Sequence, residues 1–302
     1  MKREPVEVLG AVAHPGGLLV RHPEVSIGVV RAAARSSGLT LDLIARTPRD
    51  PNGAPQHSLT DPGDWGRQRI GWVDSGGQVR RQHMINGSSG GLHGGDTVEH
   101  RGLYVLPPLF GEVSFVFEWS EIGFPETVVP LVLPTREEVE RTERSIWSAP
   151  RVGVPVEEEF ERDLSDRRRD RPALEQGVVV AAPMVLHGSD DAAVALTRLT
   201  DHGSQLSLAV LSVARGAVTR GIAPALHGLR EIGPSTGGAD IAVVQGRRAH
   251  RVWSFEGSRS SGVDAFTAST EHALARPSSG VLDLLVSWPL AGLDEVRVEL
   301  TL

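Results

Sequence analysis

Apolar and polar residues alternate along most of the chain, in short runs separated by Gly, Pro, Asp and Ser. Such alternation places every second side chain on one face of a strand, and turn residues between the runs are typical of antiparallel sheets. In the first half of the chain the runs predict strands over residues 17–21, 25–33, 39–46, 68–73, 79–85, 102–106, 112–119 and 126–133. In the second half they predict strands over residues 178–187, 192–199, 205–214, 240–245, 249–255, 263–268, 281–288 and 294–301. The pattern predicts a mainly β protein of the sandwich or barrel type.

The pattern of the first half returns in the second half. At an offset of 169 residues Trp119 falls on Trp288, and both copies continue as W-x3-G-x2-E. An earlier block repeats at an offset of 167, where Arg31 falls on Arg198 among alternating apolar residues. A Gly/Ser-rich segment lies between the two blocks in each half. Because these features keep one order and a nearly constant spacing, we expect two tandem, internally duplicated β-sandwich-like domains.

The region between the two halves differs from both. Thr135 and Glu138 have the spacing of a capping box, which predicts a helix over residues 135–147. The charged, Pro-interrupted segment that follows indicates a linker that wraps one domain, with Phe160 and Leu164 as anchors. The predicted organisation is a first β-rich domain over residues 1–134, a helix and linker over 135–176, and a second β-rich domain over 177–302. A further short helix is expected within 215–238.

Composition narrows the classes of function. The net charge of -7 argues against a nucleic-acid partner, because such binding depends on clustered Lys and Arg. The absence of cysteine excludes disulfides, thiolate nucleophiles and thiolate-bound metals. No apolar run approaches the roughly 20 residues of a membrane span, and the first residues lack the pattern of a signal peptide. We therefore expect a cytoplasmic protein without a membrane partner.

Three histidines near a Gly-rich segment are the first candidates for chemistry. His83, His93 and His100 lie within eighteen residues of one another, and three imidazoles on neighbouring strands are a common zinc set. Their spacing is not that of a tight ligand pair, however, and the second half has no counterparts. The Gly-rich residues 86–96 match neither a nucleophile elbow nor a phosphate-binding loop. We interpret them as a hairpin loop beside surface histidines, and we assign no metal, cofactor or catalytic residue.

Tryptophans are the second candidates. Trp72 and Trp253 are candidate stacking platforms for a sugar or another small ligand. Trp119 and Trp288 alternate in phase with apolar residues, so we expect them to complete the core of each domain.

Two carboxylates are kept between the copies. Glu126 and Glu295 each follow the turn after the repeated Trp. Glycosidase chemistry requires two carboxylates that face one cleft, whereas a Glu at the start of a strand commonly binds turn amides or an Arg. We expect the structural role for both residues.

The W-x3-G-x2-E block also carries a resemblance to other proteins. Residues 104–111 and 115–126, including Gly123 and Pro125, resemble a group of uncharacterised proteins common in high-GC Gram-positive bacteria. In that group a strand enters a W-P-x-x-G-x-P-E turn after a Pro-rich segment. This chain has Ser120 where the group has Pro, whereas the second copy has Pro289. The resemblance covers most of residues 17–147 and implies no activity, because none is established for the group.

The sequence favours a non-catalytic β-sandwich protein that binds an unknown protein partner or associates with itself. One alternative is a carbohydrate-binding or small-ligand-binding sandwich, which requires exposed tryptophans along one face. The other is a hydrolase that uses residues 83–100. The exposure of Trp119 and Trp288 and the spacing of the three histidines discriminate among these functions.

Overall fold

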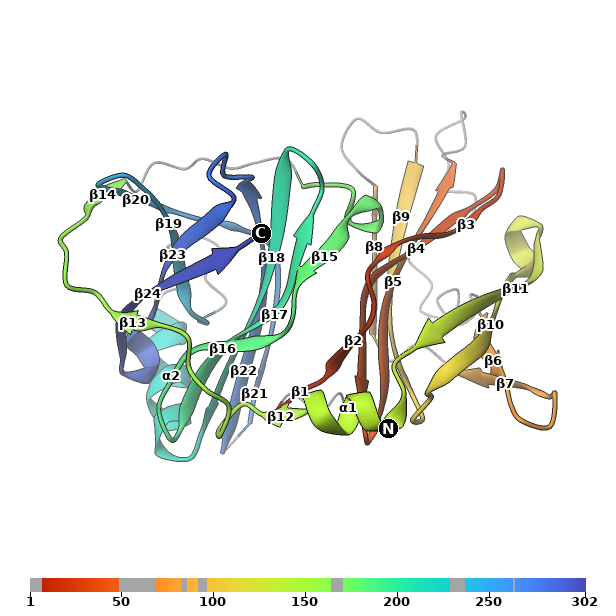
Figure 1. Cartoon of the computed structure of the whole chain (residues 1–302), viewed down its shortest axis with the longest axis horizontal. Helices are drawn as coiled ribbons and strands as arrows, with labels where there is room; N and C mark the ends of the chain where they lie inside the picture. The colour runs from red at the N-terminus through yellow and green to blue at the C-terminus, as the bar shows by residue number, and fades with distance from the viewer. Residues whose placement is uncertain are drawn as a thin grey trace. The chain divides into compact units, whose positions relative to one another are not determined.

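The computed structural model describes residues 7–48, 69–82, 86–91, 97–163, 171–228, 237–262 and 264–302 (Figure 1). Among these residues the chain forms two compact units. Unit 1 contains residues 10–143 and 174–178, and unit 2 contains residues 7–9, 144–173 and 179–302. Residues 7–9 come before the strands of unit 1 in the sequence but belong to unit 2. Residues 174–178 come before the long strands of unit 2 but belong to unit 1.

Unit 1 is a sandwich of two sheets. Its large sheet has the order β2-β4-β5-β9-β8, with β3 also paired to β4, and its small sheet has the order β11-β10-β6-β7. The elements of unit 1 are β2 (Ala11–His14), β3 (Gly17–Arg21), β4 (Ser26–Arg35), β5 (Gly38–Pro48), β6 (Arg69–Val73), β7 (Val79–Gln82), β8 (Asn86–Gly91), β9 (Thr97–Leu106), β10 (Gly111–Trp119), the 3-10 turn Ser120–Ile122, β11 (Phe124–Leu133), α1 (Arg136–Thr142) and the 3-10 turn Leu174–Gln176.

Unit 2 has the same design with additions. Its large sheet has the order β15-β17-β18-β22-β21, with β16 also paired to β17, and its small sheet has the order β13-β24-β23-β19-β20-β14. The elements of unit 2 are β1 (Val8–Leu9), β12 (Arg144–Ser145), β13 (Val154–Pro155), β14 (Glu161–Asp163), β15 (Val178–Ala181), β16 (Met184–Gly188), β17 (Ala192–Asp201), β18 (Gln205–Arg215), α2 (Ala217–Gly228), β19 (Asp240–Gln245), β20 (Arg248–Arg251), β21 (Ser254–Ser261), β22 (Ala265–Ala275), β23 (Val281–Trp288), the 3-10 turn Pro289–Ala291 and β24 (Leu293–Thr301). A separate pair joins β1 to β12.

The two strand orders show the duplication directly. Each strand of unit 1 has a counterpart in unit 2 at the same place in its sheet, from β2 and β15 to β11 and β24. The β-bulges are also kept, between Val29 and Arg31 in one copy and between Leu196 and Arg198 in the other. The prediction of a mainly β protein with duplicated antiparallel sandwiches is confirmed.

The cores follow from the alternation seen in the sequence. In unit 1 the inward side chains of β5, among them Leu41 and Leu43, meet those of β10, among them Phe115 and Phe117. All four side chains are at most 2% exposed. Burying each of them stabilises the fold by about 1.5–3 kcal/mol. Unit 2 repeats this arrangement between β18 and β23.

The helix after unit 1 is shorter than predicted. α1 begins with the expected capping box, in which Thr135 accepts from the Glu138 backbone and its own N–H donates to the Glu138 carboxylate. It ends at Thr142, however, and residues 144–145 form β12. The prediction of a helix up to residue 147 is wrong because Ile146 packs with the apolar residues of unit 2 and its N–H donates to the Glu7 carbonyl. The helix expected within 215–238 is α2.

Two further predictions need correction. Residues 86–91 and 254–261 of the Gly/Ser-rich segments are not loops: β8 and β21 are edge strands that pair with β9 and β22, and residues 92–96 lie outside the described residues. Backbone pairing with a long neighbouring strand supplies their hydrogen bonds whatever their side chains are. The predicted strand 249–255 divides into β20 and β21, which belong to different sheets. Within the described part of the chain, no helix is both long enough and apolar enough to cross a membrane.

Candidate functional site

His100 is the member of the histidine set that lies in a described segment; His83 and His93 lie outside the described residues. Its ring makes an edge-to-face contact with Trp119, with 4.9 Å between the ring centroids. Burial lowers the pKa of His100 to about 4, so the imidazole is neutral at pH 7. His100 is half-buried, which is less exposed than the surface position expected from the sequence. Across the described residues no group of three or more His, Asp or Glu side chains is arranged to hold a metal.

The tryptophans do not form a repeated platform. Trp288 is fully buried, and its Nε1–H donates to a backbone carbonyl at 2.8 Å. Trp119 and Trp72 are half-buried against the core of unit 1. Trp253 is half-buried and lies between β20 and β21, with the Arg251 guanidinium 4.9 Å from its ring centroid. Because Trp72 is on β6, the two candidate platforms occupy different places in the duplicated fold.

The two kept carboxylates are ion-paired. Glu126 binds Arg81 of β7, with 2.9 Å between Oε2 and the guanidinium nitrogen. Glu295 binds Arg162 of β14. These contacts agree with the structural role expected from the sequence. Surface ion pairs of this kind contribute at most about 1 kcal/mol.

The linker wraps the small sheet of unit 2. At one edge β13 pairs with β24, where Val154 lies opposite Arg297, and at the other edge β14 pairs in parallel with β20. Between the two edges Phe160 and Val156 pack on the outer face of the sheet. The apolar residues beneath them are Ala242, Val244, Ala249 and Leu285. Phe160 is thus an anchor, as the sequence predicts, whereas Leu164 lies outside the described residues.

The outer edges of the corresponding sheet of unit 1 differ from those of unit 2. In the described residues no strand pairs with the outer edge of β11 or of β7. Val128 of β11 corresponds to Arg297, the residue opposite β13 in the other copy. Val128 is 54% exposed and Val132 is 79% exposed. A free edge with apolar side chains readily accepts another strand.

The two edges differ in their protection. β7 carries Arg80 and Arg81, and charged side chains on an edge strand discourage pairing. From Thr127 to Leu133, β11 has no charged residue. Its one protective residue in that stretch is Pro130, which has no N–H to donate. The segment around Val128 is therefore the open part of this edge.

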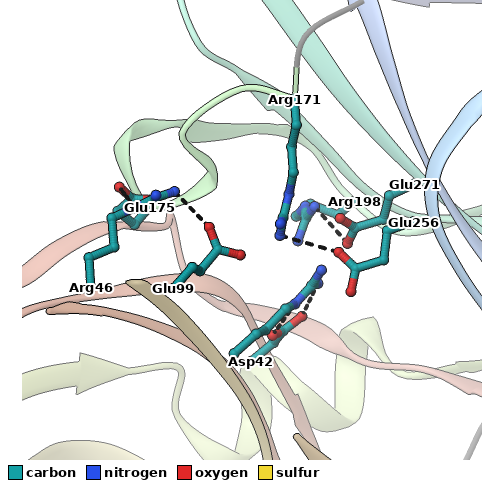
Figure 2. Close-up of polar contacts among 9 residues, drawn as sticks. Asp42, Arg46, Glu99, Arg171, Glu175, Arg198, Glu256 and Glu271 are labelled. Carbon is teal, nitrogen blue, oxygen red and sulfur yellow. Dashed lines mark hydrogen bonds and ion pairs between the residues drawn. The ribbon is translucent and has the colours of Figure 1, made fainter. Parts of the chain in front are cut away.

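A second feature of unit 1 is a buried ionic cluster on the large sheet. The 3-10 turn Leu174–Gln176, here called the strap, packs against β3, β4 and β5. Glu175 of the strap accepts from Arg46 of β5 at 2.7 Å and 3.2 Å, and Arg46 also contacts Glu99 of β9 at 2.8 Å (Figure 2). The side chains of Glu175 and Glu99 are 4% and 6% exposed. The cluster joins segments 129 positions apart in the sequence.

Unit 2 places its buried charges elsewhere. Arg198, the repeat counterpart of Arg31, contacts Glu271 at 3.0 Å and is 2% exposed (Figure 2). Arg171 contacts Glu256 at 3.2 Å, and both side chains are half-buried (Figure 2). Sequence reasoning assigned a functional role to none of these residues, although Arg198 appears in the repeat. The sequence feature that could have identified the cluster is a charged residue where the repeat has an apolar one. Arg46 falls on Val213 of the other copy.

Comparison with known proteins adds little to this geometry. No protein-family model matches the chain, and no curated protein matches it. Among solved structures it is similar to bovine butyrophilin, with 12% identity and a TM-score of 0.22, over 95% of this chain and 99% of that one. It is also similar to a conserved domain protein from Bacillus anthracis, with 7% identity and a TM-score of 0.23, over 97% of this chain and 90% of that one. Similarity at these TM-scores carries no argument about fold or function.

Proposed function

We propose that the protein is a non-catalytic binding module that takes an extended segment of a protein partner against the outer edge of β11. The observation that carries this proposal is the duplicate itself. At the matching edge of unit 2, β13 already adds to β24 as an antiparallel strand. The same fold therefore accepts an added strand at this position, and in unit 1 no described strand fills it.

The chemistry of the edge defines the partner. Main-chain groups of β11 supply hydrogen bonds that any extended peptide satisfies, and side chains at alternate positions supply selectivity. Val128 and Val132 favour small or β-branched apolar residues on the added strand. Because residues 127–133 carry no charge, an uncharged segment suits this edge. Residues 152–156, Val-Gly-Val-Pro-Val, show such a segment within the protein.

The residues considered as catalytic candidates in the sequence have other contacts, which supports a non-catalytic function. Glu126 and Glu295 are held by arginines, and the His100 ring is packed beside Trp119. A catalytic acid or base needs access to the proton that it transfers. The His100 ring is half-buried, and Glu126, although 47% exposed, is engaged by Arg81.

The test uses a synthetic peptide of residues 152–156 as the probe and amide hydrogen exchange of the 302-residue chain as the readout. At millimolar peptide we expect slower exchange in β11 around Val128, because new inter-strand hydrogen bonds protect these amides. Val128→Lys should weaken this protection at least tenfold. Val178→Lys is the matched control, because Val178 of β15 is also 54% exposed.

Two results would overturn the proposal. One is the absence of protection in β11 at saturating peptide, and the other is an equal loss of protection in the control variant. Sedimentation of the free protein is measured in parallel. A dimer that Val128→Lys abolishes would assign the edge to a second copy of this chain instead of another protein.

A further inference from the structure

The strap lies in a socket that the large sheet of unit 1 leaves open for it. A Cβ added to Gly28 of β4 would lie 2.3 Å from the Cβ of Glu175, so only glycine permits this approach. A Cβ added to Gly16 would lie 2.9 Å from the Gly177 carbonyl oxygen. Leu174 is 2% exposed. Gly28 of β4 thus makes room for Glu175 of the strap, and Gly16, between β2 and β3, makes room for Gly177, which follows the strap.

The socket recognises a carboxylate. Arg46 presents two guanidinium nitrogens to the two oxygens of Glu175, which is the fork-to-fork geometry that favours arginine over lysine. Glu99 contacts the same guanidinium group and so fixes its position. Arg46 is 13% exposed, so water competes weakly for this contact.

The second copy shows that the fold does not require this chemistry. At the positions of Gly28 and Arg46, unit 2 has Ala195 and Val213. These residues pack with Leu9 and Ile146 in an apolar cluster. A buried ion pair is commonly no more stabilising than well-packed apolar residues, and its best-attested use is to specify one arrangement. The ionic socket of unit 1 is therefore suited to selective docking.

We propose that this socket is a second peptide-binding site, specific for a short turn in which an aliphatic residue directly precedes a carboxylate residue. The strap is its ligand in cis, with Leu174 and Glu175 as the two recognised residues. A partner protein that presents the same pair of residues competes with the strap. This site lies on the large sheet and uses none of the residues of the β11 edge, so either proposal can fail alone.

The first experiment measures binding of a labelled synthetic peptide of residues 172–178. The 302-residue chain used for this measurement carries Leu174→Ser and Glu175→Gln, which weaken the strap in cis. We expect this variant to bind the peptide at least tenfold more tightly than the unchanged protein does, because its socket is vacated. A peptide with Gln in place of Glu175 should bind at least tenfold more weakly, because it lacks the carboxylate.

A paired substitution controls for position. In the strap-weakened protein, Gly28→Val fills the socket and should abolish binding of the peptide. Ala195→Val makes a comparable enlargement at the corresponding position of unit 2 and should leave binding unchanged. Absence of binding at 1 mM peptide by a folded strap-weakened protein would overturn the proposal, as would equal loss in both enlarged variants.

Hydrogen exchange of the unchanged protein keeps the proposal testable if the variants do not fold. A strap that exchanges with ligands must open without global unfolding. We expect amides of the strap to exchange at least 100-fold faster than the core amides of β4 and β5. Exchange of the strap only together with those strands would identify it as fixed packing and overturn the proposal.

Discussion

The two copies of the sandwich use different side chains at positions where another segment of the chain can pack against them. On the outer face of the large sheet, Arg46 of unit 1 holds a carboxylate, whereas Val213 of unit 2 contacts apolar side chains. At the edge of the small sheet, β24 is covered by β13, whereas no described strand covers β11. The fold sets where a segment can dock, and the side chains at those positions set which segment it is.

The largest effect is expected where the ionic socket is broken on one side. Arg46→Met leaves Glu99 and Glu175 buried without their shared cation, and losing one partner of a buried pair costs about 3–5 kcal/mol. Urea denaturation followed by circular dichroism measures this loss. Val213→Met changes the corresponding position of unit 2 without stranding a charge, so it should cost less, about 1–3 kcal/mol from overpacking.

Replacing the charged residues of the unit 1 cluster by uncharged ones, as in unit 2, tests the same difference between the two copies. The combined variant Arg46→Val, Glu99→Thr and Glu175→Leu removes every charge of the cluster together. Its free energy of unfolding should lie within about 2 kcal/mol of the original, because none of the three members is left as a buried charge without its partner in the cluster. A combined variant as unstable as Arg46→Met would show that the fold itself depends on the ionic cluster.

An intermediate effect concerns acid. Tyr104 and His272 occupy corresponding positions, opposite Leu41 and Leu208. Burial lowers the pKa of His272 to about 4 and raises that of Tyr104. Below pH 6.5 His272 binds a proton in the unfolded state but stays neutral in the folded state. The stability that this residue contributes above pH 6.5 is therefore lost as the pH falls towards 4.

This linkage lowers stability by about 2 kcal/mol between pH 7 and pH 5 through His272. His272→Gln should remove that part of the pH dependence, as measured by urea denaturation at both values. Part of the slope should remain, because burial also lowers the pKa of His100. An unchanged slope in His272→Gln would contradict the assignment.

The smallest effect concerns the linker. Phe160→Ala removes the half-buried anchor of the wrapped sheet and should cost about 1–2 kcal/mol. Faster amide exchange in β20 and β24 should accompany it, because β13 and β14 lose their support. Phe110→Ala is the matched control, since Phe110 of unit 1 also lies half-buried beneath a guanidinium group, that of Arg136 at 4.5 Å. It should leave exchange in those two strands unchanged.

Much of this fold can be predicted from the sequence, because it depends on the local alternation of apolar and polar residues. The strands with strong apolar periodicity, such as β10 and β23, lie where the pattern places them, and the capping box at Thr135 starts α1. The apolar pattern does not predict β8 and β21, because Gly and Ser are not typical strand residues. They are strands because a long neighbour pairs with them.

The candidate sites were less accessible to sequence reasoning. Arg46 and Glu175 meet only because the chain returns to unit 1 after β14, and no local pattern predicts that path. That no described strand covers the edge of β11 becomes apparent only when both strand orders are known. What the sequence did offer was the duplication, which makes each position of one copy a control for the other.

The wrapped sheet has a mechanical consequence. Residues 154–163 are fastened at two opposite edges, by β13 and by β14, with Phe160 between them. Tension applied through this segment is shared between two sets of backbone hydrogen bonds and an apolar contact. The small sheet of unit 2 should therefore resist pulling at forces that already separate the outermost strand of its counterpart.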